Sequence, residues 1–212
     1  MIASDPFDTA VRRSFADLAS EDSVRTTVAA LEAKGFVVAR ARDRADARRI
    51  VLELIPEGSE VSHGVSMTLQ ATGIVDALDG RYDNLGARLR KMDRATEGDR
   101  IRRLITTPGV MLGSVHAITE DGTLLAGSSS GTQLAAYAAG AGRVILVVGT
   151  QKIVADVDEG LRRLEEHSLP LEDARARAAY GMPGMLNKIL IIRGELVPGR
   201  ITIVLVDEVL GF

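Results

Sequence analysis

Apolar residues along this chain switch repeatedly between the spacing of a helix and that of a strand. Val24, Val28 and Leu31 recur at the helical interval and Gly35 follows as a stop, so residues 1–34 are predicted to form an N-terminal segment of two helices that packs on the rest. Strand-like apolar runs then alternate with helical ones, with strands predicted at residues 36–39, 60–62, 143–149, 189–192 and 201–206. This alternation is typical of an α/β protein with a mostly parallel sheet flanked by helices on both faces.

Two segments in the second half of the chain have the clearest patterns. Residues 143–149 are almost entirely apolar, as expected of a central strand that is buried on both faces. Residues 115–119 and 123–126 are short strands separated by Asp121-Gly122, which predicts a β-hairpin. No repeat or linker interrupts the sequence, so residues 1–212 are expected to form a single domain.

Other helical segments give weaker signals. Residues 80–94 are polar and rich in arginine, and they are interpreted as a loop or an exposed helix. Thr96-x-x-Asp99 predicts a capping box at the start of the next helix. Pro170 is expected to open a further helix.

Composition narrows the class of function. No apolar run is long enough to span a bilayer and the first residues lack an apolar signal region, so we expect a cytoplasmic protein. The 26 basic and 29 acidic residues give a net charge of −3, and hence no reason to expect nucleic-acid or membrane partners. The chain has no cysteine, and His63, His116 and His167 lack metal-ligand spacing, so we expect no metal and no cofactor.

Two loops of small residues are candidates for an anion site. Gly64-x-Ser66-x-Thr68 follows a strand and precedes a helix, where backbone N–H groups and two hydroxyls would meet an anion. The alternative is that Ser66 or Thr68 only caps the helix, and both roles can hold at once. Residues 127–131 form the second, weaker candidate. A Walker A loop is excluded, because Ser128 stands where that loop requires lysine.

Two charged side chains are candidates for chemistry. Lys152 comes just after the buried strand, and the carboxyl ends of parallel strands are where such sheets bind ligands. If the loops converge there, Lys152 would add the fixed positive charge of an anion site; a solvated strand cap is the alternative. Glu120, at the hairpin tip, is either a general base or a solvated turn residue.

Taken together, several stretches of the sequence resemble the LUD domain of lactate utilization proteins. The family's Gly-x-Ser-x-Thr-Leu turn is matched by residues 64–69, and its ending is nearly intact in residues 199–212. The segment that begins at His116 corresponds to the family's Asn-Ala-Ile-Thr-Glu-x-Gly hairpin. The segment that begins at Gly131 corresponds to its Gly-Asn-Arg motif before a helix, and the one that begins at Gly149 to its Gly-x-Asn-Lys-Ile-Val motif at the end of a strand. The resemblance implies Glu120 as the candidate catalytic residue, and it implies ligand-binding roles for Gly64, Ser66, Thr68, His116, Gly122, Gly131, Thr132, Gln133, Gly149, Gln151 and Lys152.

The sequence departs from the family pattern at several of these positions. His116 and Gln151 each replace an asparagine, and Thr132-Gln133 replaces Asn-Arg. The cysteine cluster that many short members carry is absent from residues 180–193. Loss of the arginine weakens carboxylate recognition at Gln133, while the positions that persist imply a pocket with altered specificity.

The resemblance also implies a fold and a function. The fold is expected to be similar to that of ribose-5-phosphate isomerase, glucosamine-6-phosphate deaminase and the CoA transferases. The implied function is to bind a small anionic metabolite and to act with iron–sulfur oxidoreductase subunits in the oxidation of lactate to pyruvate; a homo-oligomer stays open. One alternative is a self-sufficient enzyme, CoA-transferase-like or phosphosugar-isomerase-like, that uses Glu120, and another is a degenerate scaffold without ligand.

Overall fold

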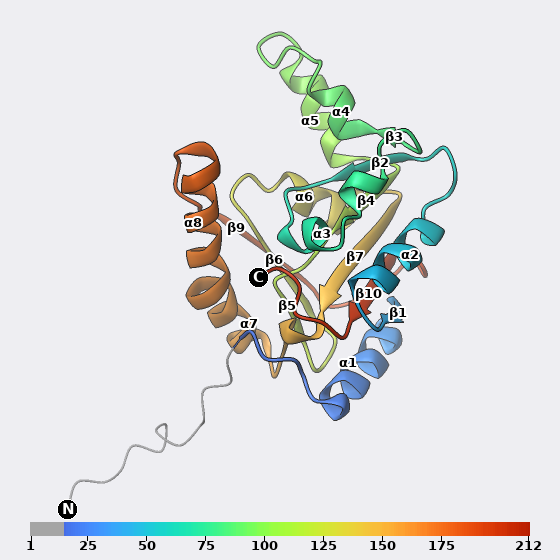
Figure 1. Ribbon diagram of the computed structural model, residues 1–212, viewed down its shortest axis with the longest axis vertical. Helices are drawn as coiled ribbons and strands as arrows, with labels where there is room; N and C mark the ends of the chain where they lie inside the picture. Colours follow the sequence, from blue (N-terminus) through green and yellow to red (C-terminus); the bar gives the residue numbers. More distant parts are fainter. Residues whose placement is uncertain (1–14) are drawn as a thin grey trace, which may run out of the picture.

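The structure, a computed structural model, describes residues 15–212 (Figure 1). Its α-helices are α1 (Glu21–Ala33), α2 (Arg44–Leu54), α3 (Met67–Ala71), α4 (Leu85–Leu89), α5 (Gly98–Thr106), α6 (Thr132–Ala135), α7 (Val157–Arg163) and α8 (Leu169–Tyr180). Short 3-10 turns occur at η1 (Val75–Ala77) and η3 (Thr150–Lys152), and π-helical turns at η2 (Ala136–Gly140) and η4 (Leu164–Ser168). Of the two predicted N-terminal helices, the second is α1; the first falls largely on residues 1–14, outside the described part of the chain.

A six-stranded parallel sheet forms the centre of the molecule. Its strands follow the order β1 (Val37–Ala41), β10 (Ile201–Val206), β7 (Arg143–Gly149), β4 (Val110–Gly113), β2 (Glu60–His63) and β3 (Asp83–Asn84). Every neighbouring pair is parallel, and in β7 Ile145 lies opposite Thr202 on one side and Leu112 on the other. The predicted parallel sheet and its central strand are therefore confirmed.

The hairpin belongs to a second sheet, which the sequence pattern does not predict. This sheet has four strands in the order β8 (Ile153–Val154), β5 (Ala117–Thr119), β6 (Leu124–Ser128) and β9 (Lys188–Ile192). Strands β5 and β6 pair antiparallel and turn at Gly122, whose φ of +81° favours glycine. The hairpin itself is thus confirmed, and β8 and β9 extend it on either side.

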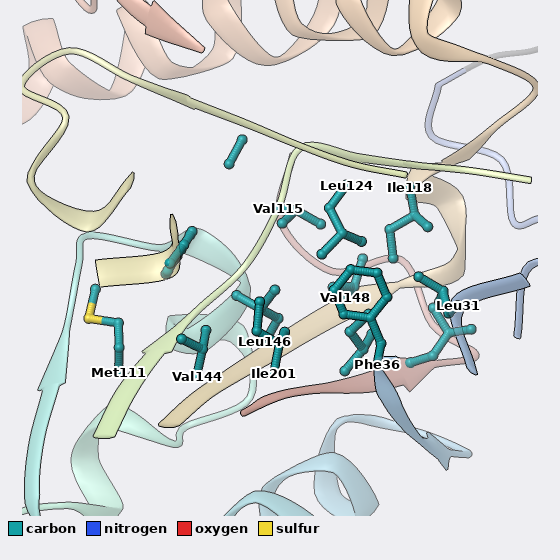
Figure 2. Close-up of a cluster of buried hydrophobic side chains, with 14 of the residues drawn as sticks. Leu31, Phe36, Met111, Val115, Ile118, Leu124, Val144, Leu146, Val148 and Ile201 are labelled. Carbon is teal, nitrogen blue, oxygen red and sulfur yellow. The ribbon is translucent and has the colours of Figure 1, made fainter. Parts of the chain in front are cut away.

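Alternate side chains of β7 supply two separate cores. Val144, Leu146 and Val148 face the second sheet and α1, in the cluster that Figure 2 shows. Ile145 and Val147 face the opposite side, where α2 and α3 cover the sheet. All five side chains are fully buried, as expected of a strand between two apolar layers.

Five of the eight α-helices in the described residues begin with a side-chain cap, and α5, α6 and α8 do not. Helices α1, α2 and α7 begin after side chains that each accept a hydrogen bond from the backbone N–H three residues on, namely Ser20, Asp43 and Asp156. The predicted capping box is wrong, because Thr96 donates to Asp93 (2.9 Å) and α5 begins without a side-chain cap. Pro170 lies in the first turn of α8, as predicted, and residues 80–94 contain β3 and α4. Across residues 15–212, no helix is both long and apolar enough to cross a membrane.

The tip of the hairpin packs directly on the backbone of α1, which generates a prediction about stability. A Cβ atom at Gly122 would lie 2.8 Å from the carbonyl carbon of Ala30 and from the amide nitrogen of Leu31. Gly122→Ala should therefore lower the free energy of unfolding by about 3 kcal/mol, from backbone strain and overpacking together. Gly58 is the matched control: its φ is also positive (+72°) but no atom lies within 4 Å of a Cβ there. Gly58→Ala should cost only about 1 kcal/mol in urea unfolding; equal losses in the two variants would contradict the packing argument.

Candidate functional site

A cavity of about 600 Å³ lies at the carboxyl ends of β2, β4 and β7. This edge of a parallel sheet is where α/β proteins bind ligands. The second sheet contributes the end of β6, and α8 with residues 182–186 closes the opposite wall. Figure 1 shows α8 standing beside β6 and β9. The predicted loops at residues 64–68 and 127–131 both reach this cavity.

The first loop both lines the cavity and starts a helix. Gly64, Ser66 and Thr68 are lining residues. The Ser66 hydroxyl accepts a hydrogen bond from the Leu69 N–H (3.3 Å) and so caps α3. The Thr68 hydroxyl donates to the Leu210 carbonyl (3.2 Å). The capping role of Ser66 is therefore confirmed, and the anion-binding role of this loop stays a prediction.

Lys152 is a buried side chain, and not the solvated strand cap that sequence alone allows. It is 1% exposed, and its Nζ donates to Thr68 Oγ1 (3.0 Å), Ser114 Oγ (3.2 Å) and the Val115 carbonyl (3.2 Å). Within residues 15–212 no carboxylate lies within ion-pair distance of this nitrogen. The three oxygens satisfy its hydrogen bonds but do not neutralise a charge.

Burial makes the charged form of Lys152 unfavourable. Desolvation holds the pKa of Lys152 well below its ordinary value of 10.5, and the nearby charge of Arg163 lowers that pKa further. Burial therefore opposes the fixed positive charge that the sequence predicts at Lys152, and that charge stays a prediction.

Arg163 is a second buried cation, and sequence reasoning missed it. It is fully buried, and its guanidinium donates to the His116 carbonyl (2.5 Å), Ser168 Oγ (3.2 Å) and the Phe15 carbonyl (3.2 Å). Its Nε has no partner in the described part of the chain, and burial lowers its pKa to about 10. One signal for the burial of Arg163 was available in the sequence. Arg163 follows Gly160 by three residues, on the helix face that also carries the apolar Leu164.

His116 presents a neutral ring to the cavity. Its Nδ1 accepts a hydrogen bond from the Gly127 N–H (3.1 Å), so the ring proton sits on Nε2. Burial lowers the pKa of His116 to about 3, with smaller contributions from Lys152 and Arg163. Nε2 has no hydrogen-bond partner among residues 15–212, and His116 lines the cavity. Its N–H is thus available to a ligand as a donor.

The serine-rich loop is held in shape by its own hydrogen bonds. Ser128 Oγ donates to Gln133 Oε1 (3.0 Å) and accepts from the Gly131 N–H (2.9 Å). Gly131 has a φ of +86° and precedes α6 without itself lining the cavity. Thr132 and Gln133 do line it. Gln133 therefore stabilises the loop with a neutral amide.

The hairpin tip lies away from the cavity. Glu120 accepts a hydrogen bond from the Ser23 hydroxyl of α1 (2.6 Å) and is not a lining residue. Gly122 packs on α1, as described above, and is not a lining residue either. The structure therefore does not bring the candidate base together with Lys152 and His116.

Gln151 and Gly149 hold the C-terminal segment in place and do not line the cavity. The Gln151 amide donates to the Leu210 carbonyl (3.0 Å), and Leu210 is also the acceptor for Thr68. A Cβ at Gly149 would lie 2.1 Å from Gln151 Oε1. These two residues therefore affect the cavity only indirectly, by fixing the C-terminal segment beside α3.

The wall formed by α8 was not foreseen. Glu172 and Arg175 line it as an ion pair (Arg175 Nε to Glu172 Oε2, 2.7 Å), and the Arg175 guanidinium lies 5.3 Å from the Tyr180 ring centroid. Met182 and Met185 are 60% and 45% exposed, so apolar side chains surround the mouth while Lys152 lies deep. An acid and a base three residues apart on a helix are typical of solvated faces, so the sequence carried no signal here.

Residues 15–212 contain no cluster of three or more side chains that could hold a metal ion.

The parallel sheet and its flanking helices define an α/β protein. Its cavity lies at the carboxyl ends of the strands, where such sheets bind ligands. The LUD domain family matches residues 24–206, and the chain belongs to this family. A crystal structure of a DUF162 family protein from Deinococcus radiodurans has a similar fold, with a TM-score of 0.55 and 15% sequence identity, over 90% of this chain and 100% of that chain. None of the curated proteins matches the chain.

The buried amine generates a prediction about pH dependence. Between the lowered pKa of Lys152 and its ordinary value of 10.5, the unfolded chain binds a proton that the folded protein lacks. The free energy of unfolding should therefore rise with pH in this range, by up to about 1.4 kcal/mol per pH unit. Lys152→Met should flatten this rise, while Thr68 and Ser114 keep acceptors for their hydroxyls at Leu210 and Val115.

The measurement is urea unfolding of both proteins from about pH 7 to about pH 9. The exposed Lys91 provides the control, and Lys91→Met should keep the slope of the parent protein. Equal slopes in the parent and in Lys152→Met would show that Lys152 is charged in the folded state.

Proposed function

We propose that the cavity binds a small anionic metabolite of the carboxylate class, and that the protein acts with iron–sulfur redox partners in the oxidation of lactate to pyruvate. The observation that carries the binding proposal is a pair of buried basic side chains without an acid partner, one lining the cavity and one behind its wall. Arg163 is fully buried and Lys152 is 1% exposed, yet neither has a carboxylate within ion-pair distance in residues 15–212. Burying such groups without a counter-charge is costly, and a bound anion would offset that cost.

The cavity wall also offers neutral donors for such an anion. The Nε2–H of His116 is without a partner in the described part of the chain, and the hydroxyl-bearing residues Ser66 and Thr132 line the same cavity. Hydrogen bonds to a charged acceptor are stronger than those between neutral groups. Arg175 contributes little, because Glu172 already neutralises it. The support for an anion therefore comes from Lys152, from His116 and from the field of Arg163.

The alternative of an enzyme that uses Glu120 gains no support from this geometry. Glu120 contacts α1 and does not line the cavity. Glu172 does line it, but its carboxylate is paired with Arg175. The role in lactate oxidation rests on membership of the LUD domain family and on the resemblance to lactate utilization proteins.

A thermal-shift screen tests the anion site. Lactate, pyruvate, phosphate, sugar phosphates and CoA esters are compared with lactamide, which is an uncharged analogue of lactate. At least one anion should stabilise the folded state, by about 2.7 kcal/mol at a hundred times its dissociation constant, and lactamide should not. Lys152→Met should lose the shift and Lys91→Met should keep it. If no anion raises the midpoint, or lactamide matches lactate, the cavity is not an anion site.

Co-purification tests the proposed partners separately. The tagged full chain, recovered from its native host grown on lactate, should carry iron–sulfur oxidoreductase subunits with it. Deletion of the gene should impair growth on lactate, and reintroduction should restore it. A preparation without such subunits, together with normal growth of the deletion strain on lactate, would contradict this part of the proposal while leaving the anion site open.

A further inference from the structure

We propose that Lys152 is a covalent ligand for carbonyl compounds: its Nζ attacks the ketone carbon of an α-keto acid in the cavity and forms an imine. The proposal rests on the proposed function for the carboxylate of that acid, and it adds the reacting group and the substrate class. It stands on three observations, which are the isolation of the amine, its place in the cavity and a hydroxyl beside it.

The first observation is that no acid in residues 15–212 holds this amine as an ion pair. Its three partners are two hydroxyls and one carbonyl. Thr68 donates its own proton to the Leu210 carbonyl, so it accepts from Nζ, and the Val115 carbonyl is an acceptor only. Ser114 Oγ also accepts from Nζ, and it donates its own proton to the Val115 carbonyl (3.3 Å). All three partners are uncharged, so no counter-charge holds the amine in its protonated form.

The second observation is that Lys152 differs from the other lysines of the chain. The chain has four lysines. Lys34 pairs with Asp121, and Lys91 and Lys188 are exposed. Only Lys152 is buried and lines the cavity. Burial and a neighbouring cation, here Arg163, are the two conditions that activate a lysine toward carbonyl groups at neutral pH.

The third observation is the position of Ser114. Its Oγ lies 3.2 Å from Nζ and also lines the cavity, so it can pass a proton between the amine nitrogen and the carbonyl oxygen. The neutral His116 can donate a hydrogen bond from Nε2 to that oxygen, but its pKa of about 3 prevents it from acting as an acid near neutral pH. Ser114 is therefore the proton relay and His116 the hydrogen-bond donor.

The step balances without any oxidant or reductant. The Nζ lone pair forms a bond to the carbonyl carbon, the π electrons move to oxygen, and a proton passes from nitrogen to that oxygen through Ser114. The nitrogen lone pair of the resulting carbinolamine then forms the C=N bond, while the hydroxyl leaves as water with the second proton of the nitrogen, which passes through Ser114. Uptake of one proton from solvent gives the protonated imine, and the substrate carboxylate compensates its positive charge.

Borohydride trapping of the full-length protein tests the proposal. The probes are pyruvate and phenylpyruvate, and their hydroxy acids, lactate and phenyllactate, are matched controls that cannot form an imine. We expect each keto acid to leave one reduced adduct, equal in mass to the acid less one water plus two hydrogens, which peptide mapping places on Lys152. The hydroxy acids should leave none. Lys152→Met should lose the adduct and Lys91→Met should keep it.

A second variant keeps the test decisive if Lys152→Met folds poorly. Ser114→Ala retains the amine but removes the relay, so the adduct should still form on Lys152, at a rate lower by about tenfold or more. Without borohydride, the Ser114→Ala protein should release the keto acid unchanged. An unaltered rate in Ser114→Ala would overturn the relay, and labelling spread over Lys34, Lys91 and Lys188 would overturn the assignment of Lys152.

The outcomes separate this proposal from the anion site on which it rests. If keto and hydroxy acids both raise the midpoint but no adduct forms, the anion site stands and the imine is overturned. If the uncharged aldehyde propanal labels Lys152 while neither keto acid does, the amine is reactive, but the keto-acid assignment and the anion site both fall.

Discussion

The hydrogen bonds of one buried nitrogen connect three of the segments that line the cavity. Nζ of Lys152, just beyond β7, reaches Thr68 on α3 and also Ser114 and Val115 beyond β4. The nitrogen lies deep and has no acid partner in the described part of the chain, so its protonation state controls both the local stability and the electrostatic potential of the cavity. Groups that lower stability in this way concentrate at functional sites, where the same burial gives them unusual reactivity.

Glycines allow the elements around the cavity to pack closely on one another. A Cβ atom at Gly113 would lie 1.7 Å from the Tyr137 hydroxyl, which is within 3.4 Å of the Ser114 carbonyl. At Gly127 a Cβ would lie 2.5 Å from Leu186 Cδ1, where the end of β6 meets the segment after α8. The parallel sheet alone therefore does not make the site. Gly113 permits η2 to pack on the end of β4, and Gly127 permits the segment after α8 to pack on β6.

The parts of the structure that depend on local pattern were predictable, and the parts that depend on packing were not. The central strand at residues 143–149 and the hairpin turn at Gly122 follow from periodicity and turn chemistry. The burial of Lys152 does not, because a lysine after a strand looks the same in sequence whether or not another segment covers it. The role of Gly122 was also ambiguous, because a glycine that packs on a helix and a glycine that contacts a ligand cannot be told apart in the sequence. Gly122 packs on α1.

No positive charge lies on the glycine loop at position 133. Gln133 binds Ser128 and the Gly127 carbonyl through a neutral amide. The remaining unneutralised cation is Arg163, which stands behind His116 and donates to its carbonyl. A charge in that position acts through protein of low polarity and is screened by salt far less than an exposed arginine would be. An anion bound as proposed would therefore respond to the buried field of Arg163 and to the protonation of Lys152, and only weakly to ionic strength.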